Sequence, residues 1–197
     1  MKRTDRIVEL VEGPTVLDLG AVQHDAANAA GGDWLHGRLC EHFERVIGVD
    51  YLAGAVAELN AKGYEMVQAD VTDMSLDVTA DTVVLGELIE HVGNPGLMLD
   101  RVGEHCKPGA RVVLSTPNPW GLAYMRRMLT GAGHVNDEHV AWYGPRVLRS
   151  LLGRHGFAVE RIECLRCTDD RLTWLAERVG ATTLAGTTWI VTARWSP

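Results

Sequence analysis

Short apolar runs, each about the length of one strand, alternate along the chain with longer segments whose apolar residues recur at helical spacing. The clearest runs are VVL at 83–85 and VVL at 112–114. Continuous apolar runs are typical of parallel strands that are covered on both faces. Strands that alternate with helices predict an α/β fold, in which right-handed crossovers build a mostly parallel sheet.

Capping residues and helix breakers predict where the helices begin and end. Asp33 is expected to cap one helix, and Asn94 is expected to cap another that has Pro95 at its first position. The Lys107-Pro108-Gly109 turn is expected to end that second helix. The helix that Asp33 would cap is expected over about 34–44. Further helices are expected over about 4–11, 52–61, 145–155 and 169–179, and late strands over about 157–163 and 188–194.

Composition narrows the class of protein. The chain has 197 residues and a formal net charge of −7, and its basic clusters are only Lys2-Arg3 and Arg126-Arg127, so nucleic acid is not an expected partner. No apolar run has the length of a signal peptide or of a membrane span. We therefore expect a cytoplasmic protein without stable membrane association. Cys164 and Cys167 have CxxC spacing but no second pair, which disfavours a zinc site.

A polar cluster follows the strand expected around 83–85. Glu87, Glu90 and His91 lie directly after it in the sequence ELIEH. Open α/β sheets bind their ligands outside the carboxyl ends of the strands. The cluster is therefore the expected place of the chemistry.

Several motifs, taken in order, carry a family resemblance. TVLDLG at 15–20, VIGVD at 46–50 and VQADV at 67–71 precede ELIEHV, KPGARVVLSTPN and HVAWYGPRVLRSLLGRHGF. This series resembles the class I S-adenosylmethionine-dependent methyltransferases, and its pattern is most similar to small-molecule O-methyltransferases such as those of ubiquinone biosynthesis. The resemblance spans about 11–163 and a closing strand near 189–193.

The resemblance implies a Rossmann-like class I methyltransferase fold. Its sheet would have seven strands, mostly parallel, with an antiparallel last strand inserted beside the sixth and helices on both faces. We expect a single methyltransferase domain over residues 1–197, with a lid insertion at about 119–143 and an extra segment at about 168–186. A homodimer is left open.

The resemblance also implies S-adenosylmethionine as cofactor, with S-adenosylhomocysteine as product. Asp50 would bind the ribose hydroxyls, because charge-assisted hydrogen bonds are strong, and the glycine turn would admit the amino acid tail. Val22 and His24 stand where the family has further glycines, so the loop must run differently. The expected cofactor-binding residues are Asp18, Gly20, Ala21, Gln23, His24, Asp50, Tyr51, Leu52, Asp70, Val71, Gly86, Glu87 and Leu88.

Methyl transfer needs the acceptor to be positioned and its proton removed. His91, Glu90 and His139 are the expected catalytic residues, since an imidazole accepts a proton at neutral pH and a carboxylate can orient it. The resemblance associates Glu87, Glu90 and His91 with a divalent cation, but we assign no metal ligand. A purely structural role for these side chains stays open.

The expected function is methyl transfer from S-adenosylmethionine to a small-molecule acceptor, with oxygen favoured over nitrogen or carbon. Trp120, Tyr124 and Trp142 make the lid rich in aromatic residues, which indicates an apolar or aromatic acceptor. The alternative is a non-catalytic protein that binds S-adenosylmethionine or S-adenosylhomocysteine through a degenerate loop. A nicotinamide-dependent dehydrogenase is disfavoured, because no second glycine follows Gly20 at the required spacing.

Overall fold

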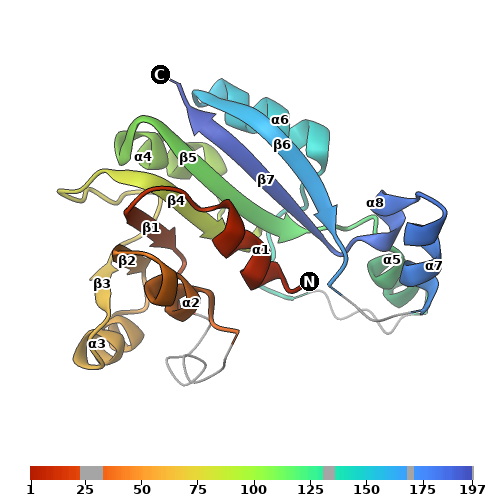
Figure 1. Ribbon diagram of the computed structural model, residues 1–197, viewed down its shortest axis with the longest axis horizontal. Helices are drawn as coiled ribbons and strands as arrows, with labels where there is room; N and C mark the ends of the chain where they lie inside the picture. Colours follow the sequence, from red (N-terminus) through yellow and green to blue (C-terminus); the bar gives the residue numbers. More distant parts are fainter. Residues whose placement is uncertain (23–32, 131–135, 168–170, 197) are drawn as a thin grey trace.

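A single twisted sheet runs through the molecule with helices on both faces (Figure 1). The computed structural model describes residues 1–22, 33–130, 136–167 and 171–196. Its seven strands have the order β3-β2-β1-β4-β5-β7-β6. The strands are β1 (Thr15–Leu19), β2 (Arg45–Asp50), β3 (Glu65–Gln68), β4 (Ala80–Gly86), β5 (Cys106–Pro117), β6 (Phe157–Leu165) and β7 (Thr188–Trp195).

The direction of the strands confirms the expected fold class. Strands β1 to β5 pair in parallel, while β7 lies antiparallel between β5 and β6. Central strands are apolar on both faces, so Val83 and Val84 are both fully buried although they point in opposite directions. The last strand along the chain, β7, is inserted between β5 and β6, which is the class I arrangement that the resemblance implies.

Two apolar clusters cover the two faces of the sheet. Helices α1 and α2 pack with residues such as Val16 and Val84 on one face, and helices α4 and α6 pack with residues such as Leu17 and Leu85 on the other. The main helices are α1 (Arg3–Leu10), α2 (Leu35–His42), α3 (Ala53–Ala61), α4 (Pro95–Glu104), α5 (Leu122–Leu129), α6 (Pro145–Arg154), α7 (Arg171–Arg178) and α8 (Thr182–Ala185).

The packing of a side chain, rather than a polar capping residue, sets the start of helix α2. The expected Asp33 cap is wrong, because Asp33 is exposed and its carboxylate pairs with Lys2 at 2.6 Å. Trp34 is the residue before the helix, and its buried indole Nε1–H donates to the carbonyl of Ala21 at 2.8 Å. The apolar ring therefore sets where the helix starts.

Helix α4 keeps its expected start but not its expected end. The Asn94 side chain accepts from the backbone N–H of Leu97, as a capping residue does. The helix ends at Glu104, and Cys106 and the expected turn at 107–109 lie inside strand β5 instead. His105 closes the helix, because its buried Nδ1–H donates to the Arg101 carbonyl while Nε2 accepts from the N–H of Leu76.

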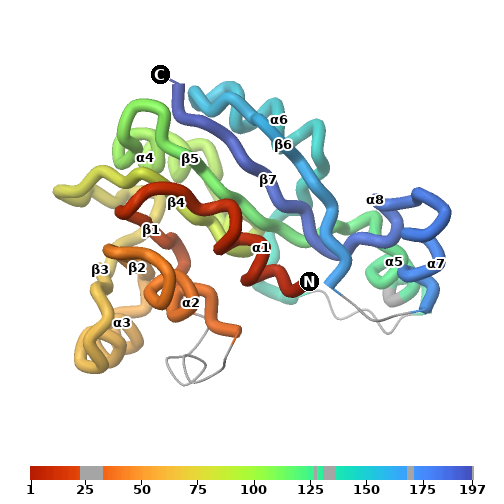
Figure 2. Tube along the Cα trace, viewed as in Figure 1, coloured from red at the N-terminus to blue at the C-terminus, as the bar shows by residue number. Residues whose placement is uncertain are grey.

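The two extra segments lie together at one end of the sheet. Helix α5 from the expected lid and helices α7 and α8 from the second segment form a small lobe near the ends of β6 and β7, seen at the right of Figure 1 and Figure 2. None of the helices that the structure describes is long and apolar enough to cross a membrane.

Candidate functional site

The first turn after β1 approaches the turn after β4. Gly20 has a φ of +71°, a conformation that favours glycine, and both its N–H and that of Ala21 donate to the Val49 carbonyl. A Cβ on Gly20 would lie 3.0 Å from a methyl carbon of Leu88. The glycine therefore lets the two turns meet at the carboxyl edge of the sheet.

Asp50 ends strand β2 beside this turn. Its carboxylate is buried and accepts from the backbone N–H of Val22 at 2.9 Å and of Leu52 at 3.1 Å. Val22 turns its side chain into an apolar cluster with Trp34 and Met66. Each carboxylate oxygen keeps capacity for a further hydrogen bond, so these contacts leave Asp50 able to accept from a ligand hydroxyl.

Asp18 contacts a residue that the sequence did not single out. The ring of His36 is fully buried, and its Nδ1 lies 3.0 Å from the Asp18 carboxylate. Burial lowers the pKa of His36, but hydrogen bonds to Asp18 and Cys40 outweigh it and raise the pKa to about 9. A buried histidine–carboxylate pair therefore lies close to the glycine turn in the sequence, and the raised pKa of His36 favours its charged form.

The turn after β4 has a strained backbone. Glu87 has a φ of +55°, which is uncommon for a residue with a side chain. Its N–H donates to both the carbonyl and the hydroxyl oxygen of Ser115, and its carboxylate lies 3.8 Å from the guanidinium of Arg3. These partners from β5 and α1 hold the turn between Gly86 and Leu88.

Asp70 follows strand β3 at the outer edge of the site. Its carboxylate accepts from the N–H and the hydroxyl of Thr72, and these hydrogen bonds hold the pKa of Asp70 below its usual range. Val71 beside it is half-buried, while Tyr51 at the end of β2 is 69% exposed. These side chains form an open rim rather than a closed wall.

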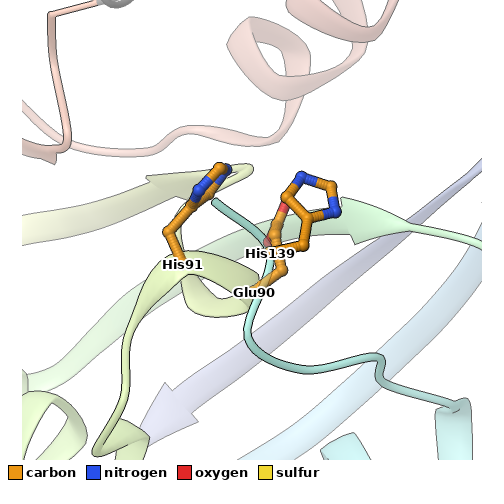
Figure 3. A group of neighbouring side chains, drawn as sticks. All are labelled: Glu90, His91 and His139. Carbon is orange, nitrogen blue, oxygen red and sulfur yellow. The ribbon is translucent and has the colours of Figure 1, made fainter. Parts of the chain in front are cut away.

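Three polar side chains meet past the ends of β4 and β5. Glu90 and His91 come from the 3-10 turn Ile89–His91, and His139 comes from the segment before α6 (Figure 3). One ligand atom from each lies within 4.8 Å of the others. The two imidazoles pack edge to face with centroids 4.7 Å apart. Backbone N–H groups of Val140 and Ala141 donate to the Glu90 carbonyl, which fixes the approach of the segment.

Burial shifts the pKa values of two side chains in this cluster. The pKa of Glu90 is raised to about 7, because the carboxyl is buried, and its Oε2 accepts from the hydroxyl of Thr116 at 3.0 Å. Burial and the neighbouring His91 lower the pKa of His139. Glu90 Oε1 and His139 Nδ1 are buried without a hydrogen-bond partner among the described residues. The cluster can therefore offer a neutral imidazole and an unpaired carboxyl oxygen.

The structure brings together most, but not all, of the residues expected from the sequence. Glu90, His91 and His139 form one cluster, although Glu87 is not among the three residues that could hold a cation. Gln23 and His24 lie outside the described residues. Four residues of the site were not expected from the sequence, namely His36, Arg3, Ser115 and Thr116.

The order of the strands, with β7 antiparallel between β5 and β6, together with the glycine turn and the acid after β2, is the arrangement of the class I methyltransferase fold. A family model described as a methyltransferase domain matches residues 1–162, so the chain belongs to that family. A SAM-dependent methyltransferase from Archaeoglobus fulgidus has a TM-score of 0.72 at 18% identity, over 98% of this chain and 91% of that one.

Other comparisons also find methyltransferases. A magnesium protoporphyrin IX methyltransferase from Synechocystis, solved with bound SAH, has a TM-score of 0.67 at 17% identity, over 98% of this chain and 82% of that one. A ubiquinone biosynthesis O-methyltransferase from Nitrobacter winogradskyi is 39% identical over 142 residues, 62% of this chain and 53% of the relative. Another, from Azorhizobium caulinodans, is 27% identical over 173 residues, 80% of this chain and 64% of the relative. The chain thus spans less than two thirds of either curated relative.

Proposed function

We propose that this chain transfers the methyl group of S-adenosylmethionine to an oxygen of a small-molecule acceptor. The observation that carries the proposal is the cluster of Glu90, His91 and His139, at the same sheet edge as the Gly20 turn. Two curated relatives named ubiquinone biosynthesis O-methyltransferase support oxygen as the methylated atom. The neighbouring aromatic residues Tyr124 and Trp142, whose rings are 5.5 Å apart, support an apolar or aromatic acceptor.

The cofactor would use the turns after β1, β2 and β4. The missing Cβ of Gly20 lets the turns after β1 and β4 meet where the amino acid tail would bind, and Asp50 offers its remaining lone pairs to the ribose hydroxyls. When bound, S-adenosylmethionine supplies a methyl carbon activated by positive sulfur. The chain's own task is to hold that carbon in line with the acceptor oxygen.

His139 or His91 would accept the proton that the methyl acceptor loses. Because two imidazoles in contact disfavour double protonation, the lowered pKa of His139 keeps one of them neutral at pH near 7. That neutral imidazole can accept the proton of a phenol or catechol hydroxyl. Glu90, His91 and His139 could also hold a divalent cation, which would lower the pKa of an acceptor hydroxyl.

The test measures cofactor binding and turnover separately. Calorimetric titration with S-adenosylhomocysteine, with and without magnesium, reports binding. Release of S-adenosylhomocysteine from S-adenosylmethionine is then followed chromatographically with a panel of phenols and catechols that carry neutral, acidic or alkyl tails. Binding with turnover supports the proposal. Binding without turnover on any acceptor would favour a non-catalytic binding protein, and methylation at nitrogen or carbon would correct the proposed atom.

Some expectations stay predictions. They are the single-domain organisation over residues 1–197, the cytoplasmic location and a homodimer. Sedimentation of the purified chain would decide whether it forms a dimer.

A further inference from the structure

A pocket lies on the face of the sheet that helix α6 covers. It has a volume of about 380 Å³ and walls from α6, β6, β7 and α8. Figure 1 shows α6 along β6 and α8 past the ends of β6 and β7. Pockets for small ligands begin at roughly 300 Å³, so this one can hold part of a small molecule.

The charged side chains of this pocket all have the same sign. Arg146 and Arg149, one helical turn apart on α6, line it together with the polar residues Thr182 and Thr183. No acidic residue is among the described residues that line it. In a chain with a net charge of −7, two arginines facing one pocket without a carboxylate favour an anionic ligand.

These two arginines keep hydrogen-bond donors available. The guanidinium groups of Arg6 and Arg45 each form an ion pair with a carboxylate, at a nitrogen–oxygen distance of 2.6 Å. Several other arginines of this chain also pair with carboxylates. Arg149 instead donates one N–H to the Val159 carbonyl, and within the described part of the chain Arg146 makes no ion pair. A guanidinium has five N–H donors in a planar fork that matches carboxylate and phosphate.

The opposite wall is apolar. Trp189 and Ile162 line it, and Trp189 is 4% exposed. The indole Nε1–H of Trp189 has no hydrogen-bond partner in the described regions. Arginines against an aromatic wall suit an acid attached to a hydrocarbon group better than a free inorganic ion.

Strand register connects this pocket to the reacting centre. Thr116, whose hydroxyl donates to Glu90, pairs with Trp189 on β7, and Trp189 pairs with Cys164 on β6. Paired residues share one face of a sheet, and neighbouring strands lie about 4.8 Å apart. The pocket is therefore about two strand spacings, roughly 10 Å, from Thr116 on the same face.

We propose that this pocket binds the carboxylate of the methyl acceptor while the oxygen to be methylated lies at the Glu90 cluster. The inference rests on the proposed function and adds a substrate class to it, namely an aromatic or apolar acid. Arg146 and Arg149 bind the carboxylate, and Trp189 packs against the hydrocarbon next to it.

The first experiment observes the pocket without turnover. Protein labelled with ¹⁵N is titrated with benzoate, with benzamide as the uncharged analogue and with inorganic phosphate, and the indole N–H signal of Trp189 is assigned with Trp189→Phe. We expect a saturable change of that signal with benzoate. We expect the double variant Arg146→Gln/Arg149→Gln to lose it, while Arg154→Gln, the same change at the end of the same helix, keeps it.

Three outcomes would overturn the proposal. They are an equal response to benzamide, an unchanged benzoate response in the double variant, and a response to phosphate alone, which would assign the pocket to phosphate esters. Titration of the same samples with S-adenosylhomocysteine distinguishes a failure of the proposed function from a failure of the pocket proposal. If that ligand fails to bind the unmodified chain, the proposed function is wrong, whereas the benzoate titration still decides what the pocket binds.

The second experiment connects the pocket to the acceptor. For whichever acids on the acceptor panel are turned over, the double variant should raise KM at least tenfold and leave kcat unchanged. A purely structural role of the arginines would lower kcat and weaken S-adenosylhomocysteine binding as well. An acceptor that is turned over without a carboxylate, with a KM that the double variant does not change, would contradict the inference.

Discussion

Replacing His36 by glutamine should remove a pH-dependent part of the stability of this fold. His36 is fully buried against Trp34 and Tyr64, whose ring centroids lie 5.3 Å and 5.9 Å from its own. Burial by itself lowers the pKa of His36, but the bonds to Asp18 and Cys40 raise it to about 9. The folded protein therefore holds a proton over a range in which the unfolded chain has released it.

The sign and size of the effect follow from this difference in proton binding. The ordinary pKa of histidine is 6.5, so the contribution of His36 is fully present below that pH. It is lost as the pH rises through about 9. Each pKa unit is worth about 1.4 kcal/mol, which makes the total about 3 kcal/mol. Glutamine can still donate to Asp18 but carries no charge, so it should remove the pH dependence.

Urea unfolding at several pH values between about 6 and 9.5 measures this effect. The unmodified chain should lose about 3 kcal/mol more than His36→Gln over that range. His42→Gln is the matched control, because His42 is exposed on the same helix and bonds only the Arg38 carbonyl among the described residues. An identical pH slope for the unmodified chain and His36→Gln would refute the charged Asp18–His36 pair.

Three further predictions concern the proposed site. Asp50→Ala should weaken S-adenosylhomocysteine binding by about 1–3 kcal/mol in calorimetry, while the exposed Asp73→Ala leaves it unchanged; equal affinities would remove the ribose role. Gly20→Ala should destabilise the fold by about 1–2 kcal/mol in urea unfolding, because of its positive φ and the nearby Leu88 methyl; an unaffected midpoint would show that the turn can rearrange. His91→Ala should lower kcat by roughly 10²-fold or more with cofactor affinity preserved, and turnover at the original rate would assign His91 a structural role.

The order of strands and helices could be predicted because periodicity reports burial. Continuous apolar runs around 83–85 and 112–114 mark strands covered on both faces, and both lie in β4 and β5. Segment ends were harder to predict where tertiary contacts replace local ones. Asp33 has the chemistry of a cap, but the packing of Trp34 decides the start of α2. His105 likewise ends α4 through its contact with Leu76.

The candidate site could be predicted in part for a similar reason. Residues next to a strand end, such as Asp50 and Glu90, are indicated by their place in the chain. His36 lies on a helix with no local signal, and only the tertiary fold brings its ring to Asp18. His139 was expected at the site, but its packing against His91 depends on the hydrogen bonds that the next two residues, Val140 and Ala141, donate to the Glu90 carbonyl.

The contacts of Val22 show how the turn after β1 accommodates a side chain where the family has a glycine. Its N–H donates to Asp50, while its side chain points into the cluster with Trp34 and Met66. A β-branched residue at this position therefore crowds the apolar interior rather than the open face of the turn. The conformation that requires glycine is at Gly20, where φ is +71° and Leu88 approaches. At Val22 the departure from the expected glycine is tolerated because the side chain is buried, whereas Gly20 is kept where the backbone needs it.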